Sequence, residues 1–172
     1  MYKRVFIGLG TNIGDRKKNL VNALRKLKRA PFLQIVNISS IYETEAMYNL
    51  DLPDFYNMVV EVETRLEPED LLSFLKKIEV EMGRDLKRQE RYEPRIIDLD
   101  IIAFQDTVVR TDKLTIPHEG MWERGFVLIP LQEIAPDYVC PVTGMEISEM
   151  VSKLDSKSRE VKKIGSVPVS EL

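Results

Sequence analysis

The stretch "RYEPRIIDLDIIAF", residues 91–104, places two aspartates close behind two arginines. Asp98 and Asp100 are two residues apart on a predicted strand, so their side chains lie on the same face, roughly 6 to 7 Å apart. The same face continues with Ile102 and Phe104. Two ionised carboxylates at this separation repel each other by about 2 to 3 kcal/mol at an effective dielectric constant near 20. A bound divalent cation would remove this repulsion.

The aspartate pair therefore predicts a metal site with oxygen ligands. No cysteine or histidine lies nearby in the sequence, and carboxylate ligands alone favour a hard cation such as Mg²⁺. In the structural alternative, one aspartate caps or turns the chain and the other pairs with Arg95. The position favours the metal, because both acids stand at the start of a core strand where apolar residues are expected.

The segment before the aspartates is rich in positive charge. Five basic side chains fall within twelve residues: Arg84, Lys87, Arg88, Arg91 and Arg95. Guanidinium groups match phosphate oxygens in a bidentate geometry, and Mg²⁺ commonly completes its coordination with phosphates. A charge run alone is more typical of a solvated loop, but its place beside the aspartate pair favours phosphate binding.

Three further features carry weaker signals. The sequence "GLGTNIGD" lacks the full spacing of a phosphate-binding loop, so its glycines are expected to permit a tight turn from strand to helix. His118 is the only histidine of the sequence, and its place after a proline is more typical of a loop hydrogen bond than of ligand contact. Phe55 and Asn57 share one face of a strand and offer a stacking ring and an amide, although they also fit a core aromatic and a strand-end amide.

The elements that must position these residues are those of a mixed α/β chain. Short β-branched runs predict strands at residues 3–9, 33–44, 55–64 and 96–104. Apolar residues at helical spacing predict helices at residues 16–29, capped by Asp15, and at 68–82, ended by Gly83. The order strand, helix, strand, strand, helix, strand is the split βαβ arrangement of ferredoxin-like folds. We expect an extra C-terminal hairpin and helices after this core, one of them near residues 147–154.

The composition is that of one globular domain spanning residues 1–172. Hydrophobic residues make up 44% and charged residues 31%, with 25 basic and 28 acidic side chains, which argues against disorder and against a nucleic-acid or membrane partner. The single cysteine, Cys140, cannot form an internal disulfide, and the first residues lack a secretory pattern. No apolar run approaches the roughly 20 residues that span a bilayer. We expect a soluble, cytoplasmic monomer.

Several stretches, taken in order, resemble one family, 6-hydroxymethyl-7,8-dihydropterin pyrophosphokinase. They are "GLGTNIGDR", "SSIYET", "FYNMVVEVET", "IEVEMGRD", "PRIIDLDI" and "IPHEGMWERGFVLIPLQEIAPD", and they cover most of residues 3–137. The most specific motifs are PRxxDxD, at residues 94–100, and PHxxMxxRxF, at residues 117–126. All of them stand in the order that the family has.

The resemblance implies a ferredoxin-like α/β fold and an enzyme of folate biosynthesis, which transfers the terminal diphosphoryl group of ATP to the pterin's hydroxymethyl oxygen and releases AMP. It implies that Asp98 and Asp100 hold two Mg²⁺ ions, with Arg84 and Arg95 as further catalytic groups and ATP as co-substrate. The implied ATP-binding residues are Glu79, Arg84, Arg91, Tyr92, Arg95, Ile101, Lys113, Thr115, His118 and Arg124. The implied pterin-binding residues are Thr44, Met47, Phe55, Asn57, Asp98 and Phe126.

Some positions depart from the commoner pattern of this family. Glu45, Ala46 and Tyr48 stand where many members have prolines and a glycine, so the shape of that loop is not expected to follow the family. Tyr92 and Phe55 replace a tryptophan and a tyrosine that are often found there, and both changes keep a flat ring. We expect the chemistry to be retained.

Two rival interpretations stay open at the level of sequence. "RVFIGLG" and "RGFVLIPL" faintly resemble the signature strands of RNA-recognition domains, but their order and the net acidic charge argue against RNA binding. A Mg²⁺-dependent kinase or hydrolase acting on another substrate would use the aspartates and arginines. It would leave Phe55, Asn57 and Phe126 without a role.

Overall fold

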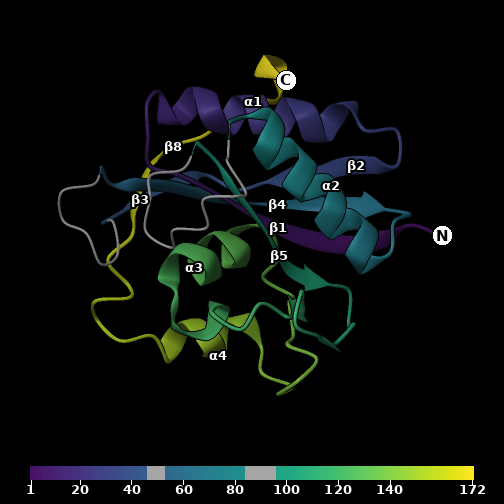
Figure 1. Ribbon diagram of the computed structural model, residues 1–172. Helices are drawn as coiled ribbons and strands as arrows, with labels where there is room; N and C mark the ends of the chain where they lie inside the picture. Colours follow the sequence, from purple (N-terminus) through teal and green to yellow (C-terminus); the bar gives the residue numbers. More distant parts are fainter. Residues whose placement is uncertain (46–52, 84–95) are drawn as a thin grey trace.

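The protein folds into three layers, with one antiparallel sheet between two pairs of helices (Figure 1). The computed structural model describes residues 1–45, 53–83 and 96–172. Within these residues the main sheet has six strands in the order β5-β1-β4-β3-β8, and β2 also pairs with β4. The strands of this sheet are β1 (Lys3–Thr11), β2 (Leu33–Ile38), β3 (Ile41–Thr44), β4 (Phe55–Thr64), β5 (Asp98–Phe104) and β8 (Lys162–Gly165). This topology confirms the predicted ferredoxin-like α/β fold.

Helices cover both faces of the sheet. One face packs against α1 (Arg16–Arg29) and α2 (Pro68–Glu81), and the other against α3 (Gly125–Ile134) and α4 (Ile147–Ser152). The short strands β6 (Val109–Arg110) and β7 (Thr115–Ile116) form the extra hairpin that was predicted. Two turns of 3₁₀ helix complete the chain, η1 (Met121–Glu123) and η2 (Val169–Glu171). Each face of the sheet thus has its own hydrophobic core.

Helix α1 begins and ends where the sequence predicts. The Asp15 side chain accepts a hydrogen bond from the backbone N of Lys18 at 3.0 Å, which satisfies one of the first amide groups of the helix. Leu20, Leu24 and Leu27 have no exposed surface, because their spacing turns one stripe of the helix toward the sheet. This packing fixes the segment between β1 and α1.

The strand predicted at residues 33–44 is wrong in one respect, since it consists of two strands. β2 and β3 both pair with β4 but are separated at Ser39 and Ser40. The backbone N of Val59 donates to the hydroxyl of Ser39 at 2.9 Å, so a side chain replaces a backbone acceptor at this point. Ser side chains commonly compete with the backbone in this way, and the break follows from it.

A β-bulge in β5 corrects the predicted alternation of that strand. The register between β1 and β5 shifts between Phe6 and Ile7, and Ile102 is the extra residue on β5. Asp98, Asp100 and Ile102 therefore share one face, as predicted, but Phe104 packs in the core under α1 and α2 instead. A bulge inserts one residue and so reverses the alternation beyond it.

The C-terminal segment, residues 153–172, runs back along the domain. Strand β8 pairs with β3, and all four residues of β8 are exposed. Near the start of the segment, the carbonyl oxygen of Ser158 lies against Gly125, where an added Cβ would be 1.8 Å from it. Further on, the carbonyl of Glu171 accepts hydrogen bonds from Arg25 of α1 at 2.9 and 2.6 Å. The sequence did not predict β8.

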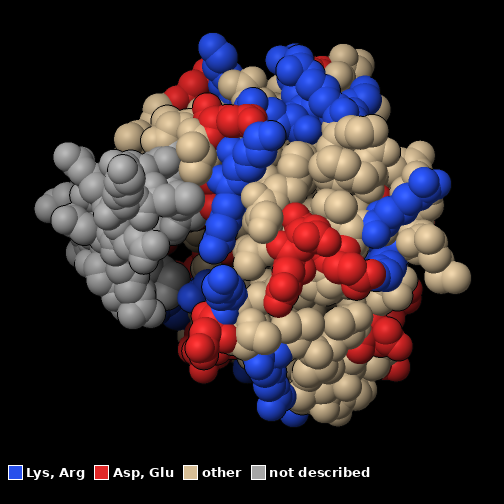
Figure 2. Space-filling model, turned by 45° about the vertical axis from the view of Figure 1, so that its right-hand side comes forward, with Lys and Arg blue, Asp and Glu red and all other residues tan. Residues whose placement is uncertain are grey.

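The surface carries both signs of charge. On the face shown in Figure 2, basic side chains run beside an acidic group and are interleaved with uncharged surface. Within residues 1–45, 53–83 and 96–172, no helix is both long enough and apolar enough to cross a membrane.

Candidate active site

Two glycines face the aspartates across the sheet. Asp98 pairs with Gly10 of β1, and Asp100 pairs with Gly8, so each carboxylate has a neighbour without a side chain. Directly opposed residues of antiparallel strands point to the same face. The face beside the two carboxylates is therefore a floor of backbone, which we call the glycine floor (Gly8 and Gly10).

The glycine floor corrects the prediction made for "GLGTNIGD". Gly8 and Gly10 lie inside β1 and have no positive φ, so they do not serve the turn. Gly14, with φ of 65°, is the residue that permits the turn before α1. An added Cβ on Gly8 would lie 3.1 Å from Ile102, and one on Gly10 would lie 3.0 Å from Asn57. Close approach, rather than turn formation, explains these two glycines.

On the other side of Gly10 lie the candidate pterin-binding residues of β3 and β4. Gly10 pairs with Asn57, and Thr44 pairs with Phe55. The Asn57 amide nitrogen donates to the Thr44 hydroxyl at 3.0 Å, and Asn57 is only 6% exposed. An added Cβ on Gly10 would also lie 3.8 Å from the Phe55 ring, so Phe55 and Asn57 face the floor together, as their spacing predicted. The candidate metal ligand Asp98 and the amide of Asn57 thus flank one glycine.

A glutamate of α3 holds β3 in place. Glu133 accepts hydrogen bonds from the backbone N and hydroxyl of Ser40 at 2.8 and 2.6 Å and from the Tyr42 hydroxyl at 3.0 Å, and Lys163 of β8 lies 3.6 Å away. Burial would by itself raise the pKa of Glu133, but hydrogen bonds from Ser40 and Tyr42 and the charge of Lys163 lower it below its ordinary value. Burial and the bond to Glu133 raise the pKa of Tyr42 to about 12. The network fixes the strand that ends in Thr44.

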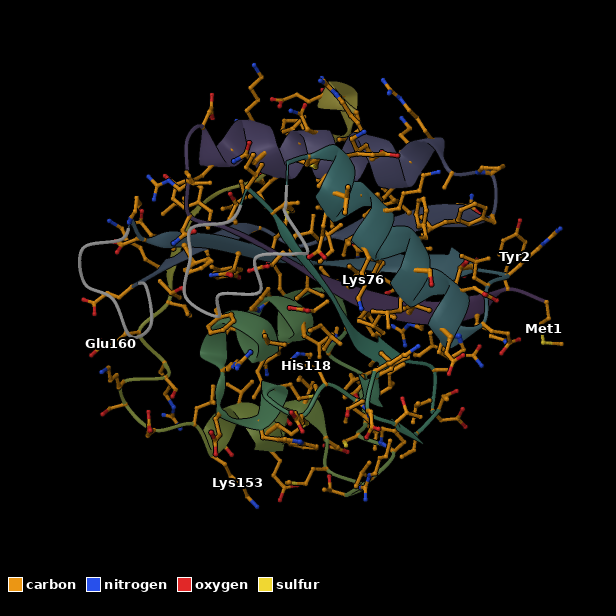
Figure 3. All side chains as sticks on the ribbon, viewed as in Figure 1. Met1, Tyr2, Lys76, His118, Lys153 and Glu160 are labelled. Atoms are coloured by element: carbon orange, nitrogen blue, oxygen red, sulfur yellow. The ribbon has the colours of Figure 1, made fainter. Side chains whose placement is uncertain are left out.

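His118 and Arg124 both lie against Gly120, and Figure 3 labels His118 beside α3. The backbone N of His118 donates to the carbonyl of Ile102 at 2.9 Å, two residues beyond Asp100. The backbone N of Gly120 donates to Nδ1 of His118 at 3.1 Å, so the expected loop hydrogen bond is present and the proton of the neutral ring lies on Nε2. An added Cβ on Gly120 would lie 2.7 Å from the guanidinium carbon of Arg124. Sequence reasoning missed this glycine.

The aromatic ring of Phe126 lies beside this group. The guanidinium carbon of Arg124 is 5.7 Å from the centre of the Phe126 ring, within the range of a cation–π contact. Phe126 is partly buried against the core under α3 and α4. A partly exposed ring can still offer one face to a flat ligand.

Two of the proposed ATP-binding residues are buried. Glu79 of α2 is 3% exposed, and its carboxylate accepts a hydrogen bond from the backbone N of Leu99 at 3.0 Å, between the two aspartates. Ile101 is also 3% exposed and packs in the core under α1 and α2. Glu79 therefore braces the start of β5, and Ile101 could meet a nucleotide only through its backbone. Their roles with ATP stay predictions.

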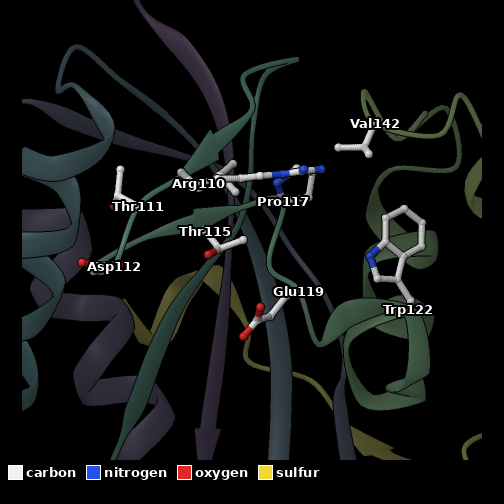
Figure 4. A pocket seen from close by; sticks show the side chains of 9 residues that line it. Arg110, Thr111, Asp112, Thr115, Pro117, Glu119, Trp122 and Val142 are labelled. Carbon is white, nitrogen blue, oxygen red and sulfur yellow. The ribbon is translucent and has the colours of Figure 1, made fainter.

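Thr115 and Lys113 lie on the hairpin of β6 and β7. Lys113 is exposed in its turn, whereas Thr115 lines a hollow of about 500 Å³ (Figure 4). The residues that line this hollow are Arg110, Thr111, Asp112, Thr115, Ile116, Pro117, Glu119, Trp122 and Val142. Neither aspartate of β5 lines it. The hollow flanks the histidine loop rather than covering the glycine floor.

The remaining site predictions fall outside the described residues. These are Met47, Arg84, Arg91, Tyr92 and Arg95, together with Lys87 and Arg88 of the basic segment and the departures Ala46 and Tyr48. Their assignments rest on the sequence alone.

Asn12 is a second feature that the sequence reasoning missed. It directly follows β1 and is 1% exposed, and neither Oδ1 nor Nδ2 has a hydrogen-bond partner. An unpaired buried amide costs roughly 1 to 3 kcal/mol. Only one other described residue has a buried side-chain nitrogen or oxygen without a partner, the hydroxyl of Tyr138. No sequence pattern distinguishes a paired asparagine from an unpaired one.

The carboxylates of Asp98 and Asp100 fit a hard divalent cation. Both stand on one face of β5 and supply oxygen donors, which are the ligands that such a cation prefers. The described residues contain no group of three His, Cys, Asp or Glu side chains that could enclose a metal on their own. A cation there would complete its coordination with phosphate oxygens and water, as Mg²⁺ commonly does.

A carboxylate pair, a nearby histidine and arginine, and an amide with an aromatic ring on one face of a ferredoxin-like sheet are typical of a small-molecule phosphotransferase. The chain belongs to the 7,8-dihydro-6-hydroxymethylpterin-pyrophosphokinase (HPPK) family, whose model matches residues 6–136. This confirms the family resemblance seen in the sequence.

Relatives of two lengths match the chain. The 2-amino-4-hydroxy-6-hydroxymethyldihydropteridine pyrophosphokinase of Methylorubrum extorquens is 38% identical over 157 residues, which cover 91% of this chain and 97% of that protein. The enzyme of the same name from Bacillus subtilis is 40% identical and covers 84% of this chain and 85% of its own length. The folic acid synthesis protein FOL1 of Dictyostelium discoideum is 40% identical over 85% of this chain, which spans only 22% of that longer protein.

Solved structures share the fold. The crystal structure of Plasmodium falciparum HPPK-DHPS with pteroate superimposes with a TM-score of 0.71 at 20% sequence identity. The match covers 89% of this chain and 42% of the other chain. It agrees with the ferredoxin-like topology described above.

Proposed function

We propose that the protein transfers the terminal diphosphoryl group of ATP to the hydroxymethyl oxygen of 6-hydroxymethyl-7,8-dihydropterin, a step of folate biosynthesis. The products are AMP and the pterin diphosphate. The observation that carries this proposal is the row Asp98, Gly10 and Asn57, which brings a candidate metal ligand and a candidate pterin-binding amide to neighbouring strands on one face of the sheet. Membership of the HPPK family supports the same reaction.

The pterin would lie on the Asn57 side of the glycine floor. Phe55 and Phe126 offer rings that can stack on a flat heterocycle, and Met47 would contribute a further apolar contact. The amide nitrogen of Asn57 already donates a hydrogen bond to Thr44, so the amide oxygen of Asn57 would accept a hydrogen bond from the polar edge of the pterin ring. A site that hydrogen-bonds a ligand's polar edge rejects analogues that lack it.

The triphosphate would lie on the aspartate side. Asp98 and Asp100 would hold two Mg²⁺ ions, which supply charge neutralisation and polarise the attacking hydroxyl when bound. Asp98, in the row of Asn57, would also border the pterin. The Nε2–H of His118, whose backbone N bonds to the carbonyl of Ile102, and the guanidinium of Arg124 would donate to the phosphates, and Arg84 and Arg95 would add positive charge. The other proposed ATP contacts are Glu79, Arg91, Tyr92, Ile101, Lys113 and Thr115.

The transfer itself needs positioning more than a strong base. The pterin oxygen forms a bond to the β-phosphorus of ATP while the bond from that phosphorus to the bridging oxygen of the α-phosphate breaks. AMP leaves with that electron pair, and the hydroxyl proton passes to solvent. In a loose transition state of this kind, fixed positive charge and alignment account for most of the rate enhancement.

We further propose that residues 1–172 form a single domain that acts as a monomer in the cytoplasm on small molecules alone. The single buried cysteine suits a reducing compartment, and two cores that share one sheet suit one folding unit. The mixed surface charge supports a small-molecule rather than a polyanionic partner.

Phosphorus NMR of the protein with ATP, Mg²⁺ and the pterin alcohol tests the reaction. We expect the paired resonances of a diphosphate ester to grow together with AMP, with no ADP at any time. ADP and a pterin monophosphate would instead show attack at the γ-phosphorus and refute diphosphoryl transfer. ATP hydrolysis that is indifferent to the pterin would favour a nucleotide hydrolase.

A further inference from the structure

An unpartnered amide stands at the end of the glycine floor. Asn12 is 1% exposed, and both polar atoms of its side chain are buried without a hydrogen-bond partner. An apolar side chain of similar size would avoid that penalty. A fold has no packing reason to prefer asparagine at such a place.

The position of Asn12 relates it to the candidate site. It lies two residues beyond Gly10, and Gly10 pairs with Asp98 on one side and with Asn57 on the other. A spacing of two along an extended chain keeps a side chain on the same face of the sheet. Asn12 is the first residue after β1 and the next position in this alternation after Gly8 and Gly10.

The backbone on both sides of Asn12 is held firmly. The Thr11 hydroxyl donates to the carbonyl of Ile96 at 2.6 Å, just before β5. The amide nitrogen of Asn19 donates to Thr11 at 3.1 Å and to the carbonyl of Ile13 at 2.8 Å. Asn12 is thus fixed in place before any ligand arrives, as a binding group should be.

The structural tasks of this segment are already filled by other side chains. Asp15 caps α1, Asn19 ties the loop to β1, and Gly14 supplies the positive φ of the turn. None of these contacts involves the amide of Asn12. Its polarity is left unexplained by the fold.

We propose that Asn12 is a substrate-contacting residue of the proposed reaction, whose amide gains its missing hydrogen bonds from the bound substrates at the Asp98 end of the glycine floor. A neutral amide donates to a phosphate oxygen or a ring nitrogen and accepts from a hydroxyl. The inference rests on the proposed function, and it adds a residue to that site.

The test replaces Asn12 by leucine, which roughly keeps the side-chain volume without the polar atoms. In a second variant it replaces Asn12 by alanine, which introduces no new bulk. We expect the melting temperature without ligand to stay the same or rise, while kcat/KM in the AMP-release assay falls about three- to tenfold. We also expect the rise in melting temperature on adding an unreactive ATP analogue and pterin to be smaller than in the wild type. Separate titrations of ATP and pterin show which KM changes.

Tyr138→Phe is the matched control. It removes the other unpartnered buried polar group of the described residues, which lies in the core under α3 and α4 against the ring of Phe6. We expect the same or higher stability with unchanged kcat/KM. The comparison separates a polar group kept for a ligand from one that is merely unsatisfied.

Several outcomes overturn the proposal. Wild-type kcat/KM in a folded Asn12 variant shows that the amide touches no substrate. A loss of stability in Asn12→Leu and Asn12→Ala, or failure of both to fold, shows that the amide serves the fold. If the wild-type protein itself releases no AMP, the proposed function fails and the role of Asn12 fails with it.

Discussion

Replacing Gly10 by alanine should weaken pterin binding selectively. An added Cβ would lie 3.0 Å from Oδ1 of Asn57, whereas ordinary contact begins at 3.4 Å, so the amide must move by about 0.4 Å. Asn57 cannot move without disturbing its 3.0 Å bond to Thr44. Asp98 lies opposite Gly10 on the other strand, and no atom of Asp98 is among the near neighbours of the added carbon.

The expected size of the effect follows from this displacement. A misplacement of about 1 Å costs roughly 100-fold in rate, so 0.4 Å costs roughly sixfold, or about 1 kcal/mol. Overpacking costs about 1 to 3 kcal/mol of stability, and the smaller conformational freedom of alanine in the unfolded chain returns about 0.4 to 1 kcal/mol. The variant should therefore fold with a modest loss of stability.

The assay measures AMP release while ATP and pterin are varied separately. We expect kcat/KM for pterin to fall about sixfold, with a higher KM for pterin, and the KM for ATP to stay within twofold of the wild-type value. Gly165→Ala is the matched control, because its added Cβ meets nothing within 4 Å on the exposed strand β8. An unchanged pterin KM in Gly10→Ala, or a rise in the ATP KM alone, would refute the placement of pterin beside Asn57.

Two further predictions concern carboxylates. Asp98→Ala and Asp100→Ala should each abolish turnover and weaken Mn²⁺ binding, which is measured by calorimetry with the unreactive ATP analogue. Each variant should melt within a few degrees of the wild type, because the relief of carboxylate repulsion offsets the lost contacts. Wild-type turnover in either variant at saturating Mg²⁺ would contradict the metal assignment. The pKa of Glu133 is lowered in the folded state, so its contribution to the free energy of unfolding is present above the ordinary glutamate value of 4.5 and is lost as the pH falls through the lower, folded-state pKa. Glu133→Gln should flatten that acid limb in denaturant titrations from pH 3 to 7, whereas Glu160→Gln at an exposed site should not, and identical slopes would count against the network.

Much of the fold follows from local sequence patterns. α1 was predictable because its cap, Asp15, and its buried leucines lie within one helix length. The shared face of Asp98 and Asp100 followed from the period of a strand. Such features depend on residues that are near one another in the chain, and local propensity therefore suffices to predict them.

Other features depend on partners far away in the sequence. The position of Phe104 was wrong because a bulge is set by the pairing of β5 with β1, which β5 alone does not reveal. The break at Ser39 depends on a hydrogen bond from Val59. β8 has no buried face and no alternating pattern, so only the available edge of β3 makes it a strand.

The residues of the candidate site show the same difference between local sequence signals and contacts with distant residues. Its charged and aromatic side chains could be assigned to the site from sequence motifs, because the residue type alone indicates the chemical role. The roles of Gly8, Gly10 and Gly120 could not, since a glycine matters there through the space it leaves between distant strands and loops. Asn12 shows the same limit, because pairing is a property of the folded environment.

The pairing of β8 with β3 also bears on how the molecules behave at high concentration. Without β8, the outer edge of β3 would present unpaired backbone groups to any other extended chain, a common start of sheet-to-sheet aggregation. β8 occupies that edge, and it carries two exposed lysines, Lys162 and Lys163, of which Lys163 also lies 3.6 Å from Glu133. Lysines on an edge strand repel a second copy and keep strands from adding. The last part of the chain thus protects the open border of the sheet from self-association as well as touching the helix that bears Phe126.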